Sequence, residues 1–425
     1  MLDRTQAPNI AQAIEFDFNL DPLEIHELSS GLPIYTMNGG VQDVVSLDFV
    51  FPAGIYAQNL IGVPKVVGSQ MRSGTSKKKS NELHKLFDYY GASFGVKVGN
   101  DLATLAVRSM SKHLPYLLPI IREILDDAQF PEEELDIYKK QAKQALEINL
   151  KKSEFQANRR IDEFLFGAEH PYGTCISAHH YDHITSDQLK AFQRSHYQIG
   201  KAKIFLAGKF SEDVLKSLEE HFGDVKLIEG NEQYSIEMKA SSEKNIRIIN
   251  DESGVQGAIR IGRKFLEKDH EDFIPFQFLN VLFGGYFGSR LMSNIREDKG
   301  YTYGIYSWLY NVKQEGAWMI ATDTGRDVAE KAVDEIFYEM KRLREEPVGE
   351  EELLLVKNYI LGSLLGQLDG PFKSMQRWKG LILNGFTKTR FDAAIKRYKE
   401  IQASEIQELA QKYLKEESFY NLIVV

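Results

Sequence analysis

The sequence predicts an α+β fold made of two homologous halves, each a mostly antiparallel sheet with helices packed on one face. Three observations support this prediction. Short alternating apolar segments indicate strands and longer amphipathic segments indicate helices. The order of these segments in the first half recurs in the second. The chain also has 425 residues, which is long enough for two or three domains.

The first half is predicted to open with two strands, around residues 24–37 and 44–52, followed by a helix over 62–75. A second helix over about 80–90 leads to a hairpin over 91–110, whose turn is the Gly-Asn-Asp sequence at its centre. These elements place a helix and a hairpin next to each other early in the chain.

Long amphipathic stretches follow, and they predict helices over 112–127 and 131–166. A segment rich in His, Gly and Ser, residues 169–183, is interpreted as a loop. It precedes a helix over 186–196 and a strand over 202–207.

The polar segment over residues 229–245 has no clear periodicity, which is typical of a linker. We therefore predict an N-terminal half over residues 1–228 and a C-terminal half over 246–425.

Three landmarks align the two halves. Residues 91–95 match 300–304 at an offset of 209, 132–135 match 350–353 at 218, and 205–207 match 422–424 at 217. One insertion of roughly nine residues near 310–316 of the second copy accounts for the change in offset. Three landmarks in one order indicate an internal duplication.

The composition excludes several classes of function. A net charge of −9 and a pI near 5.7 argue against a nucleic-acid binder and against a protein that binds anionic membranes. The sequence shows neither a signal-peptide pattern nor a stretch of about 18 apolar residues, so we expect a cytoplasmic protein. A single cysteine, Cys175, excludes an intrachain disulfide and a multi-cysteine metal cluster.

The stretch over residues 284–310 holds the candidate site. Ser289 is predicted to cap a short helix that ends at Gly300, which places Arg296 on the last turn and Tyr303 just inside the next strand. A cation and a phenol brought together by one turn could hold a peptide carbonyl and stabilise an oxyanion.

A simpler interpretation is that Arg296 pairs with Glu297 or Asp298 and that Tyr303 is one more strand aromatic. The duplication argues against it. The offset of 209 places phenylalanines, at 87 and 94, where the second copy has the cation and the phenol. Since phenylalanine would pack at least as well as tyrosine, packing alone does not explain the difference.

The predicted helix over 62–75 carries a motif frame. Gly62, Gly74 and Thr75 have the spacing G-x₁₁-G-T. With two homologous halves and a linker, the chain resembles over its whole length the inverzincin peptidases, the family of pitrilysin, insulinase and the mitochondrial processing peptidase. In that family the frame reads G-x-x-H-x-x-E-H-x-x-x-x-G-T, and two His with a distant Glu bind zinc.

The zinc-binding residues of the family are not present in this chain. The two His positions fall on Lys65 and Ser69, the general base falls on Gly68, and the distant Glu falls on Glu147. A protonated Lys repels zinc and a Ser hydroxyl is a poor zinc ligand. We therefore expect this half to be a scaffold that binds no metal or other cofactor.

The resemblance implies a different role for the second half. In the family an Arg and a Tyr, spaced as Arg296 and Tyr303 are, face the zinc and bind the substrate backbone and the oxyanion. Some members divide the work between two chains, and this sequence resembles the one without zinc. The resemblance thus implies a heterodimer with a homologous zinc-bearing subunit, which cleaves unfolded peptides bound by strand addition. The chain alone is expected to be inactive.

Four alternatives stay open or are set aside. The chain could be a structural or interaction protein of the same fold without a proteolytic role, whereas a self-sufficient enzyme would need metal ligands that are absent. The histidines at 179, 180 and 183 could hold a metal only on a helix, so a solvated polar loop is favoured. The glycines at 284, 285 and 288 are interpreted as turn residues, because no Lys-Ser/Thr follows them.

Overall fold

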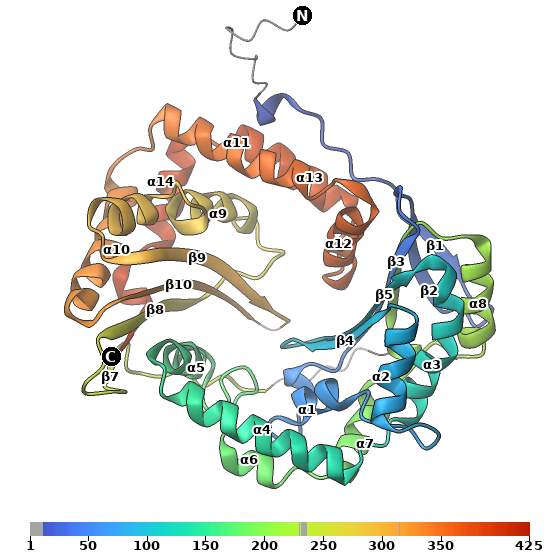
Figure 1. The fold of residues 1–425 in the computed structure, drawn as a ribbon. Helices are drawn as coiled ribbons and strands as arrows, with labels where there is room; N and C mark the ends of the chain where they lie inside the picture. The colour runs from blue at the N-terminus through green and yellow to red at the C-terminus, as the bar shows by residue number, and fades with distance from the viewer. Residues whose placement is uncertain (1–11, 229, 231–235, 314) are drawn as a thin grey trace, which may run out of the picture.

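The computed structural model of the protein describes residues 12–228, 230, 236–313 and 315–425. The predicted linker over 229–245 therefore lies partly outside the described residues, at positions 229 and 231–235. Figure 1 shows two sheets that lie on opposite sides of the molecule, with most of the helices on the outside.

The first sheet has six strands in the order β1-β2-β6-β3-β5-β4. Among these described strands only β2 and β6 run parallel. The strands are β1 (Glu24–Glu27), β2 (Pro33–Asn38), β3 (Val44–Phe51), β4 (Ser93–Val98), β5 (Ala103–Met110) and β6 (Lys203–Gly208).

The second sheet repeats five of these strands in the order β7-β11-β8-β10-β9, and within it only β7 and β11 of the described strands are parallel. The strands are β7 (Asn245–Ile248), β8 (Gln256–Phe265), β9 (Thr302–Val312), β10 (Glu315–Gly325) and β11 (Tyr420–Val424). The order matches β2-β6-β3-β5-β4 strand for strand. The predicted fold class, two homologous α+β halves with mostly antiparallel sheets, is confirmed.

Most helices of the first half lie where they were predicted, but the first one ends at Gln70 instead of 75 and the helix over 212–222 was not predicted. The helices are α1 (Val63–Gln70), α2 (Ser80–Tyr89), α3 (Leu114–Asp127), α4 (Glu132–Leu150), α5 (Ser153–Phe166), α6 (Ala178–Asp182), α7 (Ser186–His196) and α8 (Glu212–Phe222). The single strand expected over 24–37 is two strands, because the chain reverses at Gly31, where φ is 81°. The long helix over 131–166 is interrupted between α4 and α5, and the loop over 169–183 contains α6.

The helices of the second half are α9 (Phe273–Asn280), α10 (Ala329–Glu345), α11 (Glu350–Gly366), α12 (Gly370–Leu383), α13 (Lys388–Glu400) and α14 (Ala403–Tyr413), with two short π-helices, η5 (Val281–Gly285) and η6 (Met292–Asp298). The extra residues predicted for the second half are divided between two places, one before α10 and one between α10 and α11. The start of α10 lies 215 positions after the start of α3, and that of α11 lies 218 positions after that of α4. Most of the extra residues therefore lengthen the β9–β10 hairpin.

Each sheet packs its own helices on one face and one helix of the other half on the opposite face (Figure 1). On the second sheet, α5 of the first half packs Ile161 and Leu165 into a cluster with Met319 and Leu422. On the first sheet, α12 of the second half packs Met375 against strands β2, β3 and β6. The two halves therefore exchange equivalent helices.

A buried polar contact accompanies each exchanged helix. Lys379 of α12 lies 2.8 Å from the Asp48 carboxylate on β3, and Arg260 on β8 donates to the Asn158 side chain of α5 over 2.6 Å. Asp48 and Arg260 occupy equivalent places, because they lie opposite residues 205 and 422 of β6 and β11. The two sheets thus carry opposite charges at one equivalent position.

Candidate functional site

The predicted site residues Arg296 and Tyr303 lie together at the start of β9. The chain turns between η6 and β9 at Gly300, where φ is 66°, as expected of a glycine that ends a helix. The Nε of Arg296 donates to the carbonyl oxygen of Tyr303 over 3.1 Å. The contact between the two residues therefore involves the Tyr303 backbone, and the phenol takes no part in it.

The Arg296 guanidinium lies over the ring of Phe287, 4.5 Å from its centre. Its Nη1 is 3.6 Å from a carboxylate oxygen of Glu297, and about a third of the side chain is exposed. The simple pairing with Glu297 therefore exists, but an exposed ion pair of this length is weak. The outer nitrogens of the guanidinium are still accessible to a ligand.

The Tyr303 side chain is 98% exposed. Its hydroxyl makes no hydrogen bond to any residue that the structure describes. An aromatic side chain whose only role is packing would be buried. Ile305, two positions later on the same strand, is buried in this way.

A β-bulge accounts for the direction of the Tyr303 side chain. Ile305 pairs with Thr322 and Thr302 pairs with Thr324, so Tyr303 and Gly304 together oppose one residue of β10. A bulge of this kind bends its strand and re-aims a side chain. The first copy has no counterpart, because its β4–β5 register is unbroken.

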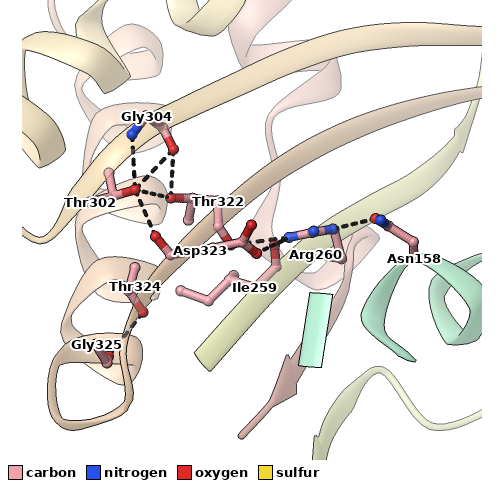
Figure 2. A network of polar contacts seen from close by, with 9 residues as sticks. All are labelled: Asn158, Ile259, Arg260, Thr302, Gly304, Thr322, Asp323, Thr324 and Gly325. Atoms are coloured by element: carbon pink, nitrogen blue, oxygen red, sulfur yellow. Dashed lines mark hydrogen bonds and ion pairs between the residues drawn. The ribbon is translucent and has the colours of Figure 1, made fainter. Parts of the chain in front are cut away.

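Two threonine hydroxyls satisfy the backbone at the bulge (Figure 2). The Thr302 hydroxyl accepts a hydrogen bond from Gly304 N over 3.0 Å and donates to the carbonyl oxygen of Asp323 over 2.8 Å. The Thr322 hydroxyl lies 2.9 Å from both Thr302 Oγ1 and the carbonyl oxygen of Gly304. The bulge is therefore held by side chains that the sequence analysis did not single out.

Arg260 extends this network to the other half of the molecule (Figure 2). Its side chain is buried, and its Nη1 donates to the carbonyl oxygen of Thr322 and to the Asp323 carboxylate over 3.1 and 3.0 Å. Its Nε bonds to Asn158 of α5. The exchanged helix of the first half is thus linked to β10, the strand that pairs with the one bearing Tyr303.

The helix that carries Arg296 is irregular as well. Lys299 N donates to Asn294 O, five residues back, so η6 is wider than an α-helix, and such segments recur at functional sites. The prediction that the Ser289 side chain caps this helix is wrong, because its buried hydroxyl has no partner among the described residues. Only the Ser289 carbonyl oxygen bonds to the helix, accepting from Ser293 N over 2.9 Å.

The first copy has a regular helix and an apolar contact at the equivalent place. Phe87 on α2 is fully buried, and its ring centre is 5.1 Å from that of Phe94. The guanidinium of Arg72 lies over both rings. The two copies therefore differ in backbone as well as in residue type at the candidate site.

Residues 183–360 match the protein family described as the peptidase M16 inactive domain. This part of the chain is therefore similar to the insulinase-like M16 peptidases. The matched residues include Arg296 and Tyr303.

Two curated relatives resemble most of the chain, and a solved structure has a similar fold. The chain is 24% identical over 368 residues to the uncharacterized zinc protease YmxG of Bacillus subtilis, covering 85% of this chain and 88% of that protein. It is 21% identical over 313 residues to the non-peptidase homolog YmxG of Helicobacter pylori, covering 72% and 71%. A crystal structure of a peptidase M16 inactive domain from Pseudomonas fluorescens has the same fold, with a TM-score of 0.82 at 21% identity over 95% of this chain and 98% of the other.

The residues at the M16 zinc motif do not fit a zinc ion. Lys65 and Ser69 are exposed on α1, but a Cβ placed on Gly68 would lie 2.5 Å from a methyl carbon of Val98, so the position has no room for the family's glutamate. Glu147 is exposed on α4. The described part of the chain holds no group of three or more His, Cys, Asp or Glu side chains that could bind a metal. No catalytic step is therefore assigned to a metal on this chain.

The histidines of the 169–183 segment form a pair. His179 and His183 place their Nε2 atoms 3.1 Å apart, and His180 instead bonds to Ser177. The nearest carboxylate, that of Asp182, accepts a hydrogen bond from Lys143 over 2.6 Å, which holds its pKa below the usual value. The helix that a metal site on these histidines would require is present as α6. The described residues offer no third side chain with which the pair could hold a metal ion.

Within the described residues, no helix combines the length and the apolar character needed to cross a membrane.

Proposed function

We propose that this chain is the non-zinc subunit of a two-chain zinc-dependent peptidase that cleaves unfolded peptides, and that Arg296 and Tyr303 bind the substrate backbone and the oxyanion. One observation carries the proposal. Tyr303 is 98% exposed on a bulge that only the second copy has, and its hydroxyl is not used within the described structure.

The arrangement suits charge stabilisation. The Nε of Arg296 is held by the Tyr303 carbonyl oxygen and the guanidinium rests on Phe287, so its outer N–H groups need no reorganisation before they meet a ligand. Donors fixed in advance near a developing negative charge stabilise a transition state strongly. The homologous partner would supply the zinc and the general base, and this chain alone would be inactive.

The strand that carries Tyr303 also suits a peptide. β9 is the last strand of its sheet in the described structure, so its outer edge has no strand partner. The carbonyl oxygens of Tyr303 and Ser307 already accept from Arg296 and Asn280, so an extended chain would pair with the edge beyond Ser307. Tyr306 and Trp308 are exposed on the same strand. Extended peptides would gain main-chain hydrogen bonds there together with aromatic contacts.

The test is to co-express the chain with a zinc-bearing homologue from its host, isolate the complex and measure peptide hydrolysis. Replacing Tyr303 by Phe should leave assembly intact and lower turnover by roughly 10²-fold or more, because one oxyanion donor is lost. Tyr306→Phe is the matched control, since it removes an exposed phenol from the same strand. Unchanged turnover of the Tyr303 variant, or no complex at all, would overturn the proposal.

A second candidate is a structural or interaction protein of the same fold without a proteolytic role. The name of the Helicobacter pylori relative, a non-peptidase homolog, favours it. The same experiment separates the two, because an interaction protein would form its complex without any Tyr303-dependent hydrolysis. The proposal keeps the expected cytoplasmic location, which cell fractionation would test.

A further inference from the structure

A large cavity lies between the two halves and away from Arg296 and Tyr303. Its volume is about 1080 Å³, at the upper end for small-molecule sites. It is lined by residues of β3, β5 and β6 of the first sheet, of α9, α12 and α13, and of the far end of β9. No residue of the candidate peptidase site lines it.

Most of the wall is apolar. It includes large side chains from both halves, namely Phe205, Phe273, Ile274, Met375, Phe391 and Ile395. β3 and β5 have neighbours on both sides in the sheet, and the backbone of α12 and α13 bonds within each helix. These walls therefore offer few free backbone groups to a peptide but much apolar surface to a hydrocarbon.

One end of the cavity is basic. Lys268, Arg377 and Arg390 are half-buried there, and none of them forms an ion pair with a described residue. The Lys268 ammonium donates to Asn384 over 2.7 Å, Arg377 donates to the amide oxygen of Gln367, and Arg390 donates to the Lys268 carbonyl oxygen. All three cations thus bond only to neutral oxygens.

The charges of both guanidinium groups act on Tyr398, whose hydroxyl donates to Gln277 over 2.9 Å. Burial raises the pKa of this phenol to about 12, although the charges of Arg377 and Arg390 oppose the rise. Burial also lowers the pKa of Lys268 and of Arg377. Holding several cations without ion-pair partners in a partly buried place is costly, which indicates an anionic partner.

Negative charge is nearly absent from the wall. Its single carboxylate, that of Asp48, is already paired with Lys379 over 2.8 Å. Two further cations, Arg108 and Lys373, also line the cavity, in a chain whose net charge is −9. The cations of the wall therefore outnumber its carboxylates, although the Asp101 carboxylate, outside the lining, also acts on Lys268.

We propose that this cavity binds one amphiphilic organic anion. Its carboxylate or phosphate head group would lie among Lys268, Arg377 and Arg390, and its hydrocarbon body would lie against the apolar wall. Charge-assisted hydrogen bonds from the guanidinium groups fix the head group. This binding site is independent of any peptidase role.

The test titrates the full-length protein with a fluorescent long-chain fatty acid. We expect saturable binding of one molecule per chain, displaced by hexadecanoate or by hexadecyl phosphate, and the stronger of the two competitors identifies the head group. Hexadecanol should compete at least roughly tenfold more weakly, because it lacks the charge. Equal competition by the alcohol, or displacement by a short acidic peptide instead, would contradict the proposal.

Variants locate the site. The double variant Arg377→Gln with Arg390→Gln should weaken binding by roughly tenfold or more, and Ala394→Trp, which fills the apolar part, should abolish it. Lys396→Gln, on the same helix as Arg390 but 3.9 Å from Glu400 and outside the lining, is the matched control and should bind normally. Each variant is first compared with the wild type by circular dichroism. Undiminished binding by folded Arg377/Arg390 and Ala394 variants would refute the assignment.

Discussion

The exposure of Tyr303 depends on two threonines that do not touch its side chain. Thr302 and Thr322 take up the backbone groups that the bulge removes from the ladder. Without them the carbonyl oxygen of Gly304 would have no hydroxyl to bond to at a largely buried position, which is unfavourable. The direction of the phenol is therefore determined by β10.

Replacing Thr322 by Val should lower the free energy of unfolding by about 1–3 kcal/mol, because the buried hydroxyl that bonds to Thr302 and Gly304 is lost while the shape is kept. Urea titration measures the change. Thr322→Ser retains the hydroxyl and should cost less. Equal values for the two variants would show that the hydroxyl does not hold the bulge.

Asp162 gives the molecule a dependence on pH. Burial raises the pKa of its carboxyl to about 7, and the charge of Lys65 opposes the rise in part. The folded state therefore binds the proton more tightly than the unfolded chain, where the value is near 3.8. This contribution to stability is fully present below about pH 4 and is lost as the pH rises through 7.

Asp162→Asn should flatten the decline in melting temperature between pH 5 and pH 8, because the amide does not titrate. Differential scanning calorimetry at several pH values tests this. The control is Asp213→Asn, which changes an exposed carboxylate and should leave the slope as in the wild type. Parallel slopes for all three proteins would rule out Asp162 as the cause.

At the scale of elements, sequence periodicity predicted the helices and turns that local interactions determine. The bounds of α2, α3 and α7 agree with the prediction within one or two residues, and the meeting of Arg296 with Tyr303 followed from a single turn at Gly300. The π-turn of η6 and the bulge of β9 could not be predicted. The bulge has partners distant in sequence, Thr322 and Arg260, and η6 bonds through Asn294 to Glu335 and Glu339 of α10.

Helix α1 packs tightly at Gly68, the position where the resemblance places the general base. Gly68→Ala should destabilise the protein by about 1–3 kcal/mol, because the new methyl group would clash with Val98. Combining it with Val98→Ala should recover part of that loss, since the shorter side chain makes room. A double-mutant cycle in urea measures the coupling. Strict additivity would show that the two positions are not in contact.

At the scale of the whole molecule, the exchange of α5 and α12 joins the halves. Lys379→Met should cost about 3–5 kcal/mol, because it leaves Asp48 charged, buried and unpaired. Replacing both residues, Asp48→Leu with Lys379→Met, should restore most of the stability. Thermal unfolding of the three proteins tests this, and a double variant as unstable as the single one would contradict it.

The exchange of helices has the geometry of a domain-swapped dimer whose two protomers have been fused into one chain. In such a dimer the two protomers share one sequence, so a substitution at the site of one copy would also be present in the other. Fusion removes that constraint. One copy could then keep Phe87 and Phe94 as packing while the other acquired a cation and an exposed phenol. The opposite charges of Asp48 and Arg260 are a further difference between the two copies. Asp48 pairs with Lys379 of α12, whereas Arg260 bonds to Asn158 of α5.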